Sequence, residues 1–154
     1  MSHDLSLRQA LAADLPAILS LQAQLGQDDG TVLDQNHALD IFRRMARYPN
    51  YWIRVAELEG VVVGSYALLV MDNLAHLGSP SAIVEDVVVD AIFRGKGIGK
   101  AMMHDAMGIA HEKGCYKLVL NSNQRRLDAH RFYEGLGFER HGVSFFVPKE
   151  GFRV

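Results

Sequence analysis

The chain has 154 residues, 49% of them hydrophobic, and its 16 Lys and Arg against 18 Asp and Glu give a formal net charge of −2. This balance creates no global field that would attract nucleic acid or an anionic membrane, so neither is expected as a partner and a small ligand is favoured. The length predicts one domain over residues 1–154. The lone Cys115, together with the absence of a signal-peptide pattern and of a long apolar run, favours the cytoplasm.

The first half of the chain predicts a strand, two helices and a β-hairpin, in that order. Residues 5–8 alternate as a strand does, and Asp14 stands at the N-cap position of the first helix. The second helix carries apolar residues at i, i+3, i+4, i+7 and i+8 and stops before Pro49, so it is expected to pack on a sheet. Glu59-Gly60 supplies the hairpin turn. The apolar residues of the second helix are Ala38, Ile41, Phe42, Met45 and Ala46, and the hairpin strands are predicted at 51–58 and 61–70.

Strands and helices alternate in the second half, which is typical of an α/β fold. After a loop at 72–80, a buried strand is predicted at 82–89, and three glycines then open a helix that Gly114 closes. Antiparallel strands at the front and strand-helix-strand units at the back predict a mixed sheet with helices on its faces. Three more elements are predicted: a strand at 116–120, a short helix at 127–136 and a last strand at 138–147.

The turn from the strand at 82–89 into the next helix is rich in glycine. Glycines there let backbone N–H groups approach a ligand without Cβ atoms in the way, and the positive end of the helix dipole favours an anion. A diphosphate is therefore the expected guest, although a tight turn with exposed cations explains the same pattern. A P-loop is excluded because neither Gly-Lys pair precedes Ser or Thr, and the glycine spacing does not fit the dinucleotide fingerprint. The turn reads Arg94-Gly95-Lys96-Gly97-Ile98-Gly99-Lys100.

Two motifs, in the right order, resemble the GCN5-related N-acetyltransferase (GNAT) family. The glycine turn matches the family's acetyl-CoA pattern, Arg or Gln, two residues, Gly, one residue, Gly or Ala, at Arg94, Gly97 and Gly99. The resemblance covers nearly the whole chain and implies the GNAT fold: a mixed, splayed sheet of about six to seven strands with about four helices on its faces and coenzyme A in the cleft. The other stretches that carry it are Glu85-Asp86-Val87-Val88-Val89-Asp90 and Ala129-His130-Arg131-Phe132-Tyr133-Glu134-Gly135-Leu136-Gly137-Phe138.

The resemblance implies acetyl-CoA as the cosubstrate, held mainly by backbone. One departure concerns the second motif: many family members carry Asn seven residues before the helix Tyr, where this chain has Arg126, with Asn121 and Asn123 nearby but shifted. No role is carried over to these asparagines. The pantetheine amides would pair with the strand at Val87, Val88 and Val89, as an added strand pairs with a sheet edge, and the diphosphate would lie on Arg94, Gly95, Lys96, Gly97, Ile98, Gly99 and Lys100.

Acetyl transfer to an amine calls for a base, an oxyanion donor and an acid for the leaving thiolate. Glu85 lies in an otherwise apolar strand, where a carboxylate is costly unless paired, solvated or used, and the resemblance implies that it is the base, directly or through a water. Asp86 points to the opposite face in a regular strand and suits the role less. The position of Tyr133 in its motif implies the acid, and the N–H of Val87 is a candidate oxyanion donor. A solvated Glu and a packed aromatic are the structural alternatives.

The remaining nucleophilic and metal-binding residue types predict no further site. His104 and His111 are seven residues apart on one helix, roughly 10 Å at about 1.5 Å per residue, too far for one ion, so no metal is expected. His76 and His130 could touch substrate, but loop or surface positions explain them more simply. Cys115 has no evident His and Asn partners and is interpreted as a buried, inert thiol.

These observations favour an N-acetyltransferase that moves acetyl from acetyl-CoA to a primary amine of a small molecule by direct attack in a ternary complex. Two stretches resemble glucosamine-6-phosphate and aminoalkylphosphonate N-acetyltransferases, which implies an anionic amine. A protein or peptide N-acetyltransferase and a non-catalytic acyl-CoA sensor are the alternatives, and family members often form homodimers. The basic side chains that could pair a phosphate or phosphonate are Arg43, Arg44, Arg47 and Arg125, although such clusters are more often solvated surface.

Overall fold

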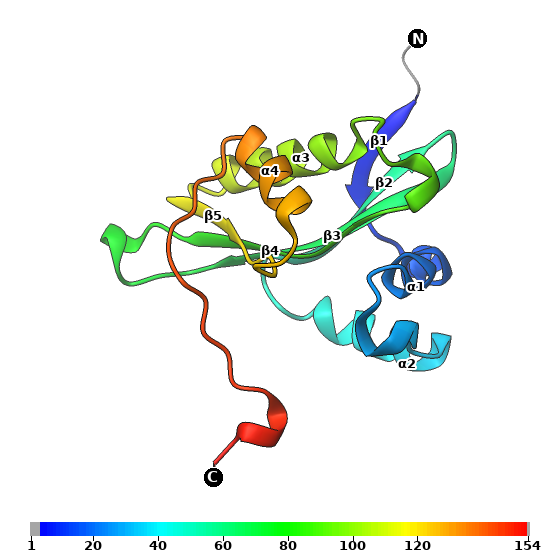
Figure 1. Cartoon of the computed structure of the whole chain (residues 1–154), viewed down its shortest axis with the longest axis horizontal. Coiled ribbons are helices and arrows are strands. Elements are labelled where there is room, and N and C mark those ends of the chain that lie inside the picture. The colour runs from blue at the N-terminus through cyan, green and yellow to red at the C-terminus, as the bar shows by residue number, and fades with distance from the viewer. Residues whose placement is uncertain (1–3, 154) are drawn as a thin grey trace. The chain divides into compact units, whose positions relative to one another are not determined.

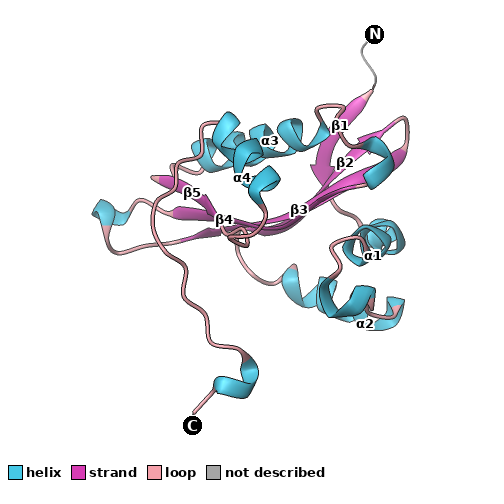
Figure 2. Cartoon of the chain, viewed as in Figure 1, coloured by secondary structure: helices cyan, strands magenta, loops and turns pink. Residues whose placement is uncertain are grey.

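The computed structural model describes residues 4–153. The chain forms two compact units, residues 1–120 and residues 121–154, which are described one after the other. Figures 1 and 2 show the helices and strands along the chain. None of the helices in the described part is long and apolar enough to cross a membrane.

The first unit holds one five-stranded sheet, with its strands side by side in the order of the sequence (Figure 2). The first four strands pair antiparallel, and the last pairs parallel to the fourth. The predicted hairpin is confirmed, because Glu59 and Gly60 have φ values of 50° and 81° and make the tight turn between its strands. The strands are β1 (Leu5–Gln9), β2 (Tyr51–Leu58), β3 (Val61–Met71), β4 (Ser81–Val89) and β5 (Lys117–Leu120).

Helices cover both faces of this sheet. The helix α3 (Ile98–Glu112) packs against β3 and β4 on one face, and α1 (Leu15–Ala23) packs against the other face with α2 (Gln35–Met45) beside it (Figure 1). The apolar stripe predicted for the second helix does face the sheet, since Phe42 packs on the buried Val55 cluster. The most buried large side chains are Val55, Val63, Tyr66, Leu68, Val84, Met102 and Met103.

The approach of α3 to the sheet depends on a glycine in β3. A Cβ built on Gly64 would lie 2.7 Å from the Met102 sulfur and 3.2 Å from the Val88 carbonyl oxygen. Met102 is fully buried there. Any larger residue at position 64 would push the helix from the strand, so Gly64 sets the depth at which α3 sits.

Two networks of paired charges fasten the N-terminal segments. Asp14 precedes α1 as predicted, but its carboxylate does not cap that helix; it accepts hydrogen bonds from the Leu11 N–H at 2.7 Å and from Arg8 at 2.7 and 2.9 Å. Arg8 also donates to Glu57 on β2. On the α3 face, Arg54 donates to the Asp105 carboxylate at 2.9 Å and Tyr66 donates to it at 2.6 Å. Arg54 also donates to the carbonyl oxygen of Leu7 on β1 at 3.4 Å.

The second unit contains α4 (Leu127–Gly135) and a long C-terminal segment. The strand predicted at 138–147 is wrong: the described backbone there is irregular and ends in a short 3₁₀ turn at Lys149–Gly151. The segment has the β-branched and aromatic residues of a strand, yet its unit offers no described strand with which to pair, and a strand exists only in a ladder. The sheet therefore has five strands rather than six or seven, while the four predicted helices are confirmed.

Candidate active site

The fourth strand is irregular at the residues that the motif singled out. Ser65 of β3 pairs with Val88, and Ala67 pairs with Glu85, so the register shifts by one residue between these two pairs. Asp86 has a φ of 52°, a left-handed conformation that is uncommon for a residue other than glycine. These are the features of a β-bulge, in which two residues of one strand stand opposite one residue of its partner.

The bulge changes which side chains share a face. Residues paired directly across neighbouring strands point to the same face, so Glu85 lies with Ala67, and Val88 lies with Ser65. Ser65 and Ala67 are two apart on β3, which places Glu85 and Val88 on one face. A regular strand would put them on opposite faces. The alternation used to place Asp86 opposite Glu85 is therefore broken at Asp86 itself.

Glu85 and Asp86 are neighbouring carboxylates that remain unpaired. Both are exposed, and neither takes part in a hydrogen bond or an ion pair with any residue from 4 to 153. Partial burial raises the pKa of Glu85, and the negative charge of Asp86 raises it further. A carboxylate with a raised pKa and no partner is suited to accept a proton near neutral pH.

The backbone beside these carboxylates is open on one side. β5 pairs with β4 only from Ser81 to Val84, so the backbone of residues 85–89 has no strand on that side among the described residues. The predicted cosubstrate residues Val87, Val88 and Val89 lie within this open stretch; Val88 is buried and the other two are half-buried. An open strand edge presents free N–H and C=O groups to an extended ligand that carries amides.

The glycine turn adopts the conformation its sequence requires. Gly95 and Gly97 have φ values of 76° and 79°, and a Cβ at either position would meet no described atom within 4 Å, so the backbone conformation itself calls for glycine. Gly97 is the N-cap of α3, and the buried Ile98 anchors the first turn of that helix. The first N–H groups of α3 have no intrahelical acceptor, which makes this end of the helix suited to an anion.

The cations of the glycine turn lie at the surface beside it. Nε of Arg94 donates to the carbonyl oxygen of Val89 at 3.3 Å, which brings the guanidinium next to the open end of β4. Lys96 lies 5.2 Å from the ring centroid of Phe93, and Lys100 is exposed in the first turn of α3. The structure thus gathers the predicted cosubstrate residues of the first unit along one path from β4 into α3.

Tyr133 belongs to the second unit, where it lies on α4. Its ring makes edge contacts with Phe132 and Phe138, at centroid distances of 5.1 and 5.6 Å. Removal from solvent raises the pKa of Tyr133, and the positive charge of Arg126 opposes that shift. The phenol therefore keeps its proton at neutral pH, as an acid must. Arg126 itself is the N-cap residue of α4, with no side-chain cap.

The other singled-out residues have structural partners. His76 stacks on Tyr116 with ring centroids 3.9 Å apart, and His130 bonds the carbonyl oxygen of Asn123 at 2.9 Å. Burial raises the pKa of Cys115, which keeps its thiol protonated. In residues 4–153 no three His, Cys, Asp or Glu side chains lie close enough together to hold a metal ion.

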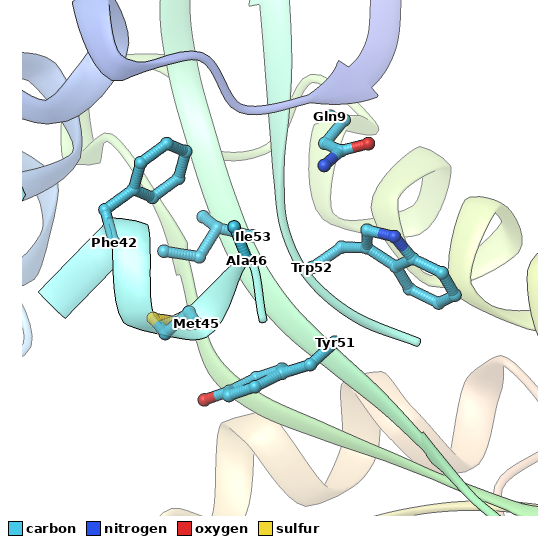
Figure 3. Close-up of a pocket in the computed structure, with 7 residues that line it drawn as sticks. All are labelled: Gln9, Phe42, Met45, Ala46, Tyr51, Trp52 and Ile53. Atoms are coloured by element: carbon cyan, nitrogen blue, oxygen red, sulfur yellow. The ribbon is translucent and has the colours of Figure 1, made fainter. Parts of the chain in front are cut away.

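Sequence reasoning missed the bulge, and it also missed a tyrosine on the same face as Glu85. Tyr51, the first residue of β2, lines a small pocket of about 30 Å³ against α2 together with Phe42, Met45 and Ile53 (Figure 3). Such a volume has room for about one water. No motif marks Tyr51; the signal is structural, because it depends on the register between β2, β3 and β4.

A model of the acetyltransferase (GNAT) family matches residues 16–138, and the chain therefore belongs to this family. It is 43% identical over 82 residues, 53% of this chain and 54% of the relative, to the glucosamine 6-phosphate N-acetyltransferase of Trypanosoma brucei brucei. It is 31% identical over 139 residues, covering 90% of this chain and 88% of the relative, to the aminoalkylphosphonate N-acetyltransferase of Salmonella typhimurium.

A solved acetyltransferase structure from Trypanosoma brucei is similar with a TM-score of 0.77 and 33% identity, covering 94% of this chain and 99% of that one. The chain spans about half the length of several curated relatives it matches, between 41% and 54% of them. The structural similarity and the family match together confirm the GNAT fold expected from the sequence.

Proposed function

We propose that the protein is an N-acetyltransferase that transfers acetyl from acetyl-CoA to a primary amine of a small molecule. The observation that carries this proposal is the pair of unpaired carboxylates at the β4 bulge, next to an open strand edge that leads into a glycine turn. Acetyl-CoA, the family's cosubstrate, would be held by the backbone of residues 87–89 and 94–100 and would supply an activated thioester. The chemistry then needs a proton acceptor and a proton donor.

Glu85 is the proton acceptor in this mechanism. The amine attacks the thioester carbonyl carbon, a C–N bond forms, and the surplus proton of the amine passes to the Glu85 carboxylate, directly or through one water. The N–H of Val87 donates a hydrogen bond to the carbonyl oxygen as it becomes negative. When the C–S bond breaks, the Tyr133 hydroxyl donates its proton to the leaving thiolate. The pKa values of Glu85 and Tyr133 are both raised, the direction that suits a base near neutral pH and an acid that stays protonated.

The acceptor is proposed to be a small anionic amine. The relatives named above act on glucosamine 6-phosphate and aminoalkylphosphonates, which are amines that carry a phosphate or phosphonate. The end of α2 presents Arg43, Arg44 and Arg47 as exposed cations that form no ion pair with an acidic side chain within residues 4–153. A guanidinium pairs well with a phosphoryl group. A protein substrate would not need these arginines, and a non-catalytic acyl-CoA sensor would need neither the arginines nor Glu85.

We further propose one domain over residues 1–154, located in the cytoplasm. The family match runs across the junction of the two units, which supports a single functional domain. The only cysteine, Cys115, is a free thiol, which suits a reducing compartment.

A homodimer is also part of this proposal. The C-terminal segment exposes large apolar side chains, with Phe145 at 91% and Phe146 at 87%, far more than a solvent-facing tail needs. A second copy of the chain would cover them. Light scattering on the wild type and on a Phe145→Ser, Phe146→Ser variant tests this: the wild type should have twice the mass of one chain and the variant should be monomeric, whereas a monomeric wild type would rule the dimer out.

The catalytic proposal is tested by thiol release from acetyl-CoA with amino sugars, aminophosphonates, polyamines, amino acids and peptides as acceptors. Turnover should appear with a small anionic amine. Glu85→Gln should lower kcat by about 10²-fold or more at neutral pH while the Kd for acetyl-CoA stays the same. Glu112→Gln, an exposed glutamate at the end of α3, is the matched control and should leave kcat unchanged.

Two outcomes would contradict this assignment. Unchanged rates in both Glu85→Gln and Tyr133→Phe would remove these residues from catalysis. Acetyl-CoA binding without thiol release for any acceptor class would favour the sensor.

A further inference from the structure

The two faces of the sheet near Glu85 differ in how much of their apolar side chains is exposed to solvent. Under α3, Leu68 and Val84 of β3 and β4 are 0% and 1% exposed. On the other face of the same two strands, Leu69 and Ile83 are only half-buried. These two residues pair with each other and lie next to Glu85 in the register. The strands therefore offer an accessible apolar floor beside the proposed base.

Tyr51 stands at the edge of this floor. It pairs with Leu69, which pairs in turn with Ile83, so the three side chains form one row on the Glu85 face. The next row is Ile53, Ala67 and Glu85. Figure 3 shows Tyr51 and Ile53 on the α2 side of β2, while Trp52 points to the other side, where Lys113 of α3 lies over its ring.

The Tyr51 hydroxyl is a free hydrogen-bonding group. It takes part in no hydrogen bond with any residue from 4 to 153, although its ring is held by an edge contact with Tyr48 at a centroid distance of 5.9 Å. Burial raises the pKa of Tyr51, and the charges of Asp86 and, to a smaller extent, Glu85 raise it further. The Tyr51 hydroxyl therefore stays protonated at neutral pH and can donate a hydrogen bond.

The charges around Tyr51 decide what it can bind. Two carboxylates nearby repel a phosphate or another anion, so the anionic group of the acceptor must lie elsewhere. What remains for the phenol is a neutral oxygen close to the amine. A sugar ring fits this arrangement, because its apolar C–H face can lie on the floor and against the aromatic ring while a ring hydroxyl meets the phenol.

We propose that Tyr51 is a specificity-determining residue of the acceptor site, whose hydroxyl donates a hydrogen bond to a hydroxyl group of an amino sugar near the amine that Glu85 deprotonates. This inference rests on the proposed function, because it takes Glu85 as the position of the amine. It deepens that function by favouring amino sugars over simple aminoalkyl acceptors.

The test compares two acceptors in Tyr51→Phe, which removes only the phenolic oxygen. With glucosamine 6-phosphate, KM should rise about tenfold, the usual effect of one lost neutral hydrogen bond, while kcat changes less than about twofold. With 2-aminoethylphosphonate, which has no alcohol hydroxyl near its amine, KM should change less than about twofold. Tyr48→Phe is the matched control, because Tyr48 is 61% exposed and should leave both acceptors unaffected. Equal effects on both acceptors, or no effect on either, would overturn the proposal.

Binding is measured in parallel by calorimetry, with glucosamine 6-phosphate titrated into the protein saturated with coenzyme A. The wild type should bind the amino sugar, and Tyr51→Phe should weaken its Kd about tenfold. This readout separates the two proposals. Binding that depends on Tyr51 without any turnover would contradict the catalytic function and keep the subsite, whereas a wild type that does not bind the amino sugar would overturn the subsite even if another amine is acetylated.

Discussion

Two pairs of acidic residues differ in their partners: Asp14 and Asp105 lie on segments that pack beside the sheet, and Glu85 and Asp86 lie in its fourth strand. Asp14 and Asp105 are held by arginines in bidentate pairs and are largely shielded from solvent. Glu85 and Asp86 are exposed and have no cation within their reach in the described structure, although they stand side by side. Paired carboxylates fasten strands and helices. Unpaired carboxylates that repel each other are kept at a cost, which is a mark of residues retained for chemistry.

The largest expected effect is on the free energy of unfolding when an aspartate of each group is replaced by asparagine. Asp105→Asn leaves Arg54 and Tyr66 with a weaker acceptor in a half-buried place and should lower the free energy of unfolding by about 2 kcal/mol. Asp86→Asn makes the same chemical change at an exposed position, and Asn tolerates a left-handed conformation, so the free energy should change by less than about 0.5 kcal/mol. Urea unfolding followed by circular dichroism measures both. A similar loss of unfolding free energy in Asp105→Asn and Asp86→Asn would contradict the division into structural and unpaired carboxylates.

The next effect is the pH dependence of stability. Arg8 lowers the pKa of Asp14 in the folded state, chiefly through their hydrogen bonds. This pair therefore stabilises the fold above the ordinary carboxyl pKa of about 3.9, and the contribution is lost as the pH falls through the lowered value. Glu85 has the opposite sign: its pKa is raised, so its ionisation removes stability as the pH rises through that value.

Unfolding measured between about pH 3 and pH 7 should show this difference in sign. Asp14→Asn should flatten the loss of stability at the acid end, whereas Glu85→Gln should slightly increase stability near neutral pH. A Glu85→Gln variant that loses stability at neutral pH would mean that Glu85 is paired in the folded protein after all.

The smallest expected effect is a shift in a pH profile. Partial removal of the carboxylate from water is the main cause of the raised pKa of Glu85 and the charge of Asp86 is the second, so Asp86→Asn should lower that pKa without returning it to the ordinary value. The acid limb of kcat/KM should move to lower pH by a fraction of a unit, with the plateau nearly unchanged. An acid limb that stays in place would show that Glu85 does not titrate in it.

The sequence was informative where local chemistry decides the structure. Glu59-Gly60 predicts its hairpin because the turn needs two positive φ values, and Gly95 and Gly97 predict their turn for the same reason. The family could also be predicted, because its motif lies in such a turn.

Prediction failed where structure depends on partners distant in the sequence. The residues at 138–147 have strand propensity, but the described part of their unit holds no strand with which they could pair. The bulge at Asp86 is set by the register against β3, which no pattern within β4 reveals. Tyr51 was missed for the same reason. The catalytic roles of Glu85 and Tyr133 remain predictions.

The bulge also has a consequence for how this strand can change over evolution. The bulge reverses the alternation of side chains along β4. Before Asp86 the odd-numbered residues point to the Glu85 face, and after it the even-numbered residues, such as Val88, point there. Deleting one residue at this point would restore a single parity along β4 and leave the side chains of both halves on the faces they occupy now. Elsewhere in a strand such a deletion slips the register of everything beyond it. At this position the sheet could absorb it, so the length of β4 can change by one residue while its other side chains keep their partners and their faces.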